Sequence, residues 1–98
     1  MKTEIETLKQ VIEHQHGGRG THLHAVKVHR MPQRSGQWNG VVHTFSLTGN
    51  SQAEMAYAWA TPVDGSTTLR YFAVLHQGGV TGPLEAVKAV LSALRTAT

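Results

Sequence analysis

The sequence predicts an α+β domain in which a helix precedes and another follows a four-stranded, mainly antiparallel sheet, in the order α-β-β-β-β-α. Three observations predict this class. Apolar residues recur at helical spacing near both ends of the chain, the residues between them alternate in four segments, and Asp64-Gly65 separates the last two segments. The 98 residues suit a single domain, residues 1–98. An apolar content of 40% with 15% charged residues is typical of a globular chain.

The first helix is expected over residues 3–15. Its apolar stripe consists of Ile5, Leu8 and Ile12, which follow one another at spacings of three and four. Thr3 followed by Glu6 is a capping-box pattern, in which each residue satisfies a free backbone N–H of the first turn. Gly17-Gly18 then ends the helix, because glycine readily adopts the left-handed conformation of a C-terminal cap.

The first two strands are expected at residues 21–30 and 38–48. Neither face of the first strand is cleanly apolar, so this strand is expected at the edge of the sheet. A loop over residues 31–36 connects the two, with Pro32 ending the first strand and Gly36 allowing a tight reversal. Because the connections are short, the strands are expected to pair in sequence order.

The last two strands, residues 53–61 and 68–76, are expected to form a hairpin around Asp64-Gly65. The symmetric pairs across that turn are Met55 with Val74, Tyr57 with Phe72, and Trp59 with Arg70. One face of the hairpin is then bulky and aromatic, and the other consists mainly of alanines. Small side chains let a helix approach closely, so the alanine face is expected to form the packed core.

The last helix is expected to begin at Pro83, whose fixed φ suits the first helical position. Its apolar residues are Leu84, Val87, Leu91 and Leu94. Both helices are expected to pack on one face of the sheet, which makes a two-layer sandwich.

The composition argues against several functional classes. There is no cysteine, and the single aspartate, Asp64, is accounted for by the turn, so no catalytic residue or cofactor is predicted. The N-terminus lacks the apolar run of a signal peptide, and no apolar stretch has the length of a membrane span. We therefore expect a soluble, cytoplasmic, non-enzymatic domain without a membrane partner.

Positive charge is concentrated in the middle of the chain. The formal net charge is +3, and residues 14–53 contain no acidic side chain. Lys27, Arg30 and Arg34 lie in this interval and are the candidate contacts for nucleic-acid phosphates, which is one alternative function. The other interpretation is a solvated edge strand and loop, since cationic side chains protect exposed edges.

Histidine is frequent, with seven residues. His22 and His24 are two positions apart, so a regular strand projects both rings from one face, as two metal ligands require. A metal site needs at least a third ligand, and the other interpretation is exposed or half-buried polar positions. His43 lies between Val41 and Phe45 on an apolar strand face, where we expect it either to act as a general base or to find one partner in the core. A histidine-centred metal-binding protein or small enzyme is therefore the second alternative function.

The aromatic face of the hairpin is the candidate binding surface. It consists of Met55, Tyr57, Trp59, Arg70 and Phe72. An exposed apolar patch with aromatic residues and arginine is typical of a protein interface, so we expect a homodimer or a protein partner at this face. The same residues suit base stacking in the nucleic-acid alternative. In the third interpretation, a helix of the same chain covers this face.

Overall fold

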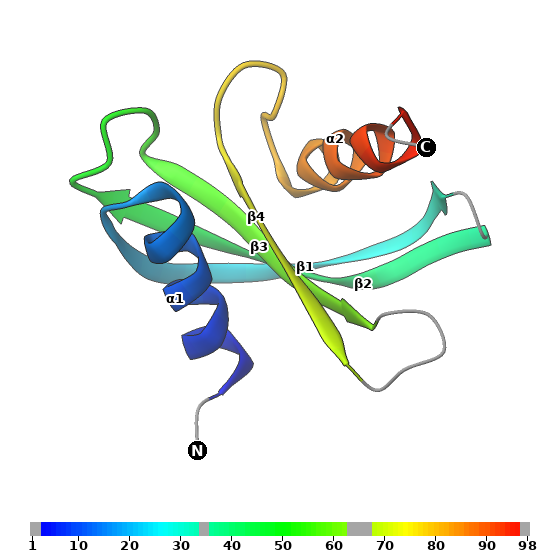
Figure 1. The fold of residues 1–98 in the computed structure, drawn as a ribbon, viewed down its shortest axis with the longest axis horizontal. Coiled ribbons are helices and arrows are strands. Elements are labelled where there is room, and N and C mark those ends of the chain that lie inside the picture. The colour runs from blue at the N-terminus through cyan, green and yellow to red at the C-terminus, as the bar shows by residue number, and fades with distance from the viewer. Residues whose placement is uncertain (1–2, 34–35, 63–67, 97–98) are drawn as a thin grey trace.

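The computed structural model describes residues 3–33, 36–62 and 68–96, and the side chains of these residues except 29–39 and 94–96. The elements in chain order are α1 (Glu4–His16), β1 (Arg19–Gln33), β2 (Gly36–Thr48), β3 (Met55–Pro62), β4 (Leu69–Leu75) and α2 (Pro83–Thr96). The four strands form one antiparallel sheet in the order β1-β2-β3-β4 (Figure 1). The predicted class, element order and strand pairing are confirmed.

The two helices lie on opposite faces of this sheet (Figure 1). Leu8 and Ile12 of α1 pack with Ala56 and Ala58 of β3 in one core. In the other core, Ala86 and Val87 of α2 pack with Val42, Tyr57 and Trp59. Tyr57 and Trp59 alternate along β3 with the alanines of the first core. Since successive strand residues point to opposite faces, the two cores lie on the two sides of one sheet. The predicted two-layer arrangement is therefore corrected to helix, sheet, helix.

The presence of apolar side chains on both faces of the sheet explains why a helix covers each face. Both faces of the β3–β4 hairpin are apolar, and a single layer of helices on one side leaves the other side in water. α1 takes the alanine face, as expected for a close approach, and α2 takes the aromatic face. The periodicity of the helices identified their apolar stripes, and did not specify which face of the sheet each stripe would cover.

The β3–β4 register differs from the symmetric prediction by two residues. Trp59 pairs with Phe72, and Tyr57 pairs with Val74. The final pair is Pro62 with Leu69, so the connection is longer than a two-residue turn. Asp64-Gly65 lies outside the described residues. A shift of two residues leaves every side chain on its predicted face, because the side-chain period of a strand is two.

β1 extends to Gln33, into the segment predicted as a loop, and β2 begins at Gly36. Pro32 pairs with Gln37, and Gln33 pairs with Gly36. Alternate residues of β2 hydrogen-bond to β1, and Trp38, the partner of Met31, is one of them. The next residue of β1, Pro32, therefore directs its nitrogen to the outer edge of the sheet. The proline thus removes no hydrogen bond between β1 and β2.

The caps of α1 follow the sequence pattern. The Thr3 hydroxyl accepts a hydrogen bond from the Glu6 N–H at 3.1 Å, and Gly17 ends the helix with a φ of 86°. In the part of the chain that the structure describes, no helix has both the length and the apolar character of a membrane span.

Candidate functional site

The predicted aromatic surface is interior. Tyr57 and Trp59 are each 2% exposed beneath α2, and the Trp59 ring stacks on Phe72 with ring centroids 5.5 Å apart. Met55 and Phe72 are half-buried, and Arg70 is exposed near the start of β4. A partner therefore cannot reach the Tyr57 and Trp59 rings while α2 is in place.

The predicted cations are placed only in part. Lys27 is exposed on β1. Arg34 and the side chain of Arg30 lie outside the described parts of the structure. The nucleic-acid alternative thus stays a prediction.

A β-bulge lies between His22 and His24, the two predicted metal ligands. His22 pairs with Phe45 and His24 with the adjacent Thr44, which leaves Leu23 as the extra residue. Phe45 and Thr44 face opposite sides of the sheet, so the regular alternation behind the metal hypothesis is interrupted. Among the described residues, no group of three or more histidine, cysteine, aspartate or glutamate side chains could hold a metal ion.

His22 instead belongs to a chain of polar contacts between α1 and the sheet. The His22 Nε2 atom lies 3.0 Å from the Nδ1 atom of His43. On its other side, the His43 Nε2 atom lies 3.5 Å from the Oε2 atom of Glu4, in the first turn of α1. We call these three residues the histidine chain. It crosses from an exposed carboxylate, through a buried imidazole, to a half-buried imidazole.

The geometry of the histidine chain favours one arrangement of protons when both rings are neutral. A carboxylate only accepts, so the contact with Glu4 favours a hydrogen on the Nε2 atom of His43. In that arrangement the Nδ1 atom of His43 is the acceptor and the Nε2–H of His22 is the donor. Burial lowers the pKa of His22, and the neighbouring His43 and His24 lower it further. Both effects favour the neutral form of the His22 imidazole.

Sequence reasoning identified His43 as a buried polar residue and missed its partner. With regular alternation, His24 lies opposite His43. The bulge moves Ala25 into that position and leaves His22 to reach the His43 ring diagonally. No feature of the sequence marks Leu23 as a bulge, since bulges require no particular residue.

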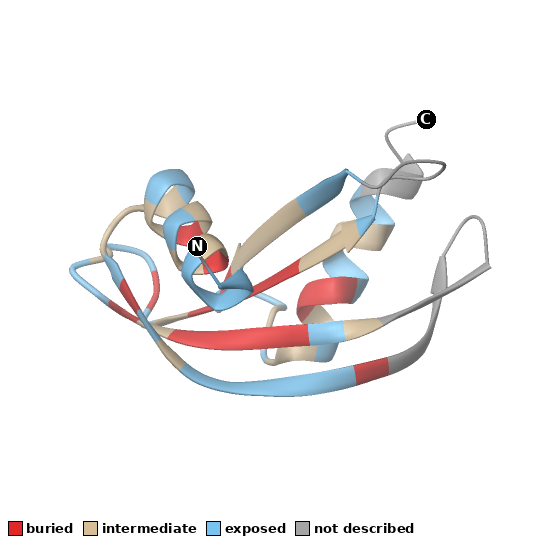
Figure 2. Cartoon of the chain, turned by 90° about the horizontal axis from the view of Figure 1, so that it is seen from below, coloured by how far each residue is buried: buried red, intermediate tan, exposed pale blue. Residues whose placement is uncertain are grey.

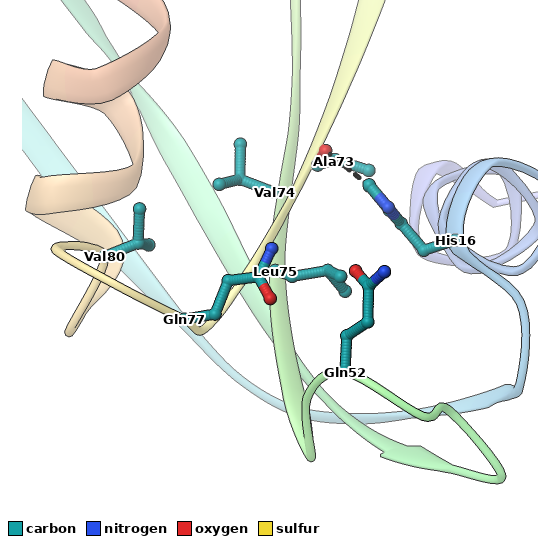
Figure 3. Close-up of a pocket in the computed structure, with 7 residues that line it drawn as sticks. All are labelled: His16, Gln52, Ala73, Val74, Leu75, Gln77 and Val80. Atoms are coloured by element: carbon teal, nitrogen blue, oxygen red, sulfur yellow. Dashed lines mark hydrogen bonds between the residues drawn. The ribbon is translucent and has the colours of Figure 1, made fainter.

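A hollow of about 320 Å³ lies at the end of β4, between α1 and the segment that leads into α2 (Figure 3). The lining residues are His16, Gln52, Ala73, Val74, Leu75, Gln77 and Val80. The His16 ring donates a hydrogen bond from Nε2 to the Ala73 carbonyl at 2.9 Å, which occupies the edge of β4 (Figure 3). The lining residues that the structure describes contain no carboxylate or ammonium group, and their glutamine amides can hydrogen-bond to an uncharged polar group.

In the described part of the sheet, three large exposed apolar side chains lie on the β1–β2 ribbon, and a fourth, Leu69, lies at the start of β4. Leu23 is 49% exposed, Val26 is 40% exposed and Val41 is 38% exposed. β1 is an edge strand, and residues 21–27 are exposed except for the half-buried His22. In Figure 2 this strand lies at the bottom of the view and is pale blue over most of its described length. We call residues 21–27 the open segment of β1.

Comparison with models of protein families, with curated proteins and with solved structures found no match.

Proposed function

We propose that this chain is a non-enzymatic interaction module that forms a homodimer by pairing the open segment of β1 with the same segment of a second copy. The observation that carries the proposal is an edge strand whose exposed side chains include Leu23 and Val26. A long edge with apolar side chains is a template for pairing with another chain. The predicted homodimer is thus retained, and its surface moves from the aromatic face to β1.

The backbone of the open segment has hydrogen-bonding groups directed outward. The Leu47 N–H donates to the Glu54 carbonyl, just before β3. Every second residue of β2, counted from Leu47, therefore hydrogen-bonds to β3. The residues between them, which include Val42, hydrogen-bond to β1. Val42 pairs with Val26, which therefore bonds β2. The N–H and carbonyl groups of Ala25 and Lys27 consequently point away from the sheet.

The two flanks of the open segment are already occupied, and so is one carbonyl of the other edge of the sheet. Before it, the N–H of Gly20 donates to the Glu13 carboxylate at 2.8 Å. After it, Val28 is buried in the core beneath α2. On the opposite edge, His16 occupies the Ala73 carbonyl of β4. Residues 21–27 are therefore the exposed stretch of the β1 edge that is available for pairing.

A second copy fits this segment because antiparallel pairing about a two-fold axis is self-complementary. With the axis at Val26, Ala25 exchanges both hydrogen bonds with the partner's Lys27, and the two Val26 side chains meet. The lysines then face alanines instead of each other, so like charges are not directly opposed.

The experiment compares the wild type with Ala25→Pro and Ala25→Ser by light scattering coupled to size exclusion, over a range of chain concentrations. Proline removes the outward N–H and no hydrogen bond of the β1–β2 ladder, whereas serine keeps the N–H. We expect a dimer for the wild type and Ala25→Ser, and a monomer with an unchanged circular dichroism spectrum for Ala25→Pro. A wild type that stays monomeric at its highest soluble concentration, or an Ala25→Pro variant that dimerises equally well, overturns the proposal.

A further inference from the structure

We propose that the histidine chain is an acid-sensitive latch, which fastens the first turn of α1 to the sheet and releases it when both imidazoles become protonated. The proposal stands on the contacts of Glu4, His43 and His22, and does not depend on self-association of the chain. The latch joins two elements that are distant in sequence, α1 and the β1–β2 ribbon.

The contact between the two rings requires that one facing nitrogen lacks a proton. The two nitrogens are 3.0 Å apart, so one must donate and the other accept. A first added proton is tolerated, because an imidazolium donates well to a neutral imidazole and Glu4 supplies a compensating negative charge. The latch therefore stays closed with one proton added to the pair.

A second added proton removes the acceptor. Both facing nitrogens then carry hydrogens, and two positive charges face each other across the same distance. His43 is 7% exposed, so water cannot replace the lost contact while α1 remains docked. Burial also lowers the pKa of His22, because it penalises the charged imidazolium.

The surroundings offer little compensation for the second charge. On α1, Glu4 is the carboxylate at the His43 ring, and the positive end of the helix dipole lies in the same turn. On β1, the residue opposite His43 is uncharged Ala25. The other nearby titratable groups of this strand are His24 and Lys27, and neither carries a negative charge. On β3, the residue opposite His43 is uncharged Ala58, and α2 packs on the other face.

Release of α1 has a defined structural consequence. Leu8 and Ile12 are completely buried against the sheet, together with Phe45, Ala56 and Ala58. Undocking of α1 uncovers this core, while the α2 core on the opposite face stays covered. A fall in pH thus exposes the apolar face of the sheet that α1 covers.

The test is amide hydrogen exchange by NMR from about pH 7.5 to about pH 5, corrected for the intrinsic pH dependence of exchange, with the imidazole signals followed in parallel. We expect the protection of the Leu8 and Ile12 amides to fall by about tenfold or more as the second imidazole titrates, while Val87 of α2 keeps its protection. Unchanged protection of α1 down to the end of this titration overturns the proposal.

Three variants separate the latch from a general effect of acid. His22→Gln and His43→Gln remove one imidazole each, and we expect the acid step in α1 protection to disappear. His14→Gln removes an exposed histidine of the same helix, and the step should persist unchanged. A step that persists in both His22→Gln and His43→Gln contradicts the proposal.

Glu4→Gln provides a variant at an exposed position, in case replacement of buried His43 prevents folding. This change removes the negative charge that stabilises the singly protonated pair. We therefore expect α1 to open at a higher pH than in the wild type. An unchanged midpoint in this folded variant overturns the role of the carboxylate in the latch.

Discussion

The Glu13 carboxylate, near the end of α1, accepts a hydrogen bond from the backbone N–H of Gly20 at 2.8 Å. Lys9 lies 2.9 Å from the same carboxylate oxygen. The Gly20 bond and then Lys9 hold the pKa of Glu13 below its usual value. The contact closes the start of the β1 edge, because Gly20 is buried and its N–H points away from β2.

Replacement of Glu13 tests this edge cap. Glu13→Ala leaves the buried Gly20 N–H without its acceptor, so we expect the free energy of unfolding to fall by about 1–3 kcal/mol. Glu13→Gln keeps an accepting oxygen and should lose less. Because the folded-state pKa is lowered, the contribution of Glu13 is present above the unfolded carboxyl pKa and disappears as the pH falls through the folded value. Urea denaturation at several pH values measures both effects. A difference in the free energy of unfolding between the wild type and Glu13→Gln that stays constant with pH contradicts the argument.

Gly18 tests the close approach of the α1–β1 connection to the end of β2. Its φ is 84°, and a Cβ atom at this position meets the Thr48 carbonyl oxygen at 2.8 Å. The neighbouring chain is tied down, because the Asn50 amide donates to the carbonyls of His16 and Gly17.

We expect Gly18→Ala to lower the free energy of unfolding by more than Gly78→Ala. Gly78 also has a positive φ, 60°, but a Cβ atom there meets nothing within 4 Å. Gly78→Ala should cost about 1–2 kcal/mol for the backbone conformation alone. The clash at Gly18 adds to a cost of that kind. Equal losses in thermal or urea denaturation would show that the Thr48 backbone yields.

Local signals predicted the elements and the faces of the sheet. The Thr3 cap, the apolar stripe of α1 and Pro83 at the start of α2 are properties of short segments, and tertiary contacts did not override them. The separation of the alanine face from the aromatic face also survived a change of register. Side chains alternate with a period of two, so the longer β3–β4 connection altered the pairs without altering the faces.

Properties that depend on the relation between distant segments were not predictable. An amphipathic stripe indicates that a helix packs on the sheet without specifying the face, so α2 rather than a partner covers Tyr57 and Trp59. The bulge at Leu23 decides which histidine meets His43. The distance from Glu4 to His43 depends on how α1 crosses the sheet, which no spacing in the sequence encodes.

Thr44 offers a test of the aromatic core. Its hydroxyl is buried and has no hydrogen-bond partner within the described parts of the chain. An unsatisfied buried hydroxyl costs about 1–3 kcal/mol, so the nearly isosteric Thr44→Val should raise the free energy of unfolding by about 1 kcal/mol. Thr44→Ser keeps the hydroxyl and loses the methyl group, and should be destabilised. A loss of stability in Thr44→Val by urea denaturation would mean that the hydroxyl has a partner.

Tyr57 predicts how stability changes at alkaline pH. Its hydroxyl is hydrogen-bonded to the Nδ1 atom of His76 at 2.6 Å, and burial, followed by the charge of Glu85, raises the pKa of Tyr57. The unfolded chain therefore loses the phenol proton first. The stability is fully present below the unfolded tyrosine pKa of about 10 and is lost as the pH rises through the folded value.

Tyr57→Phe separates the hydrogen bond from this ionisation. At neutral pH we expect the variant to lose about 0.5–1.5 kcal/mol, the net value of one hydrogen bond, because half-buried His76 can bond to water instead. Above about pH 10 its stability should fall less steeply than that of the wild type. Tyr71→Phe is the matched control, since Tyr71 is the other tyrosine, lies on the opposite face and is half-buried. Parallel alkaline profiles of the wild type and Tyr57→Phe in urea denaturation would show that Tyr57 ionises with little hindrance from the fold.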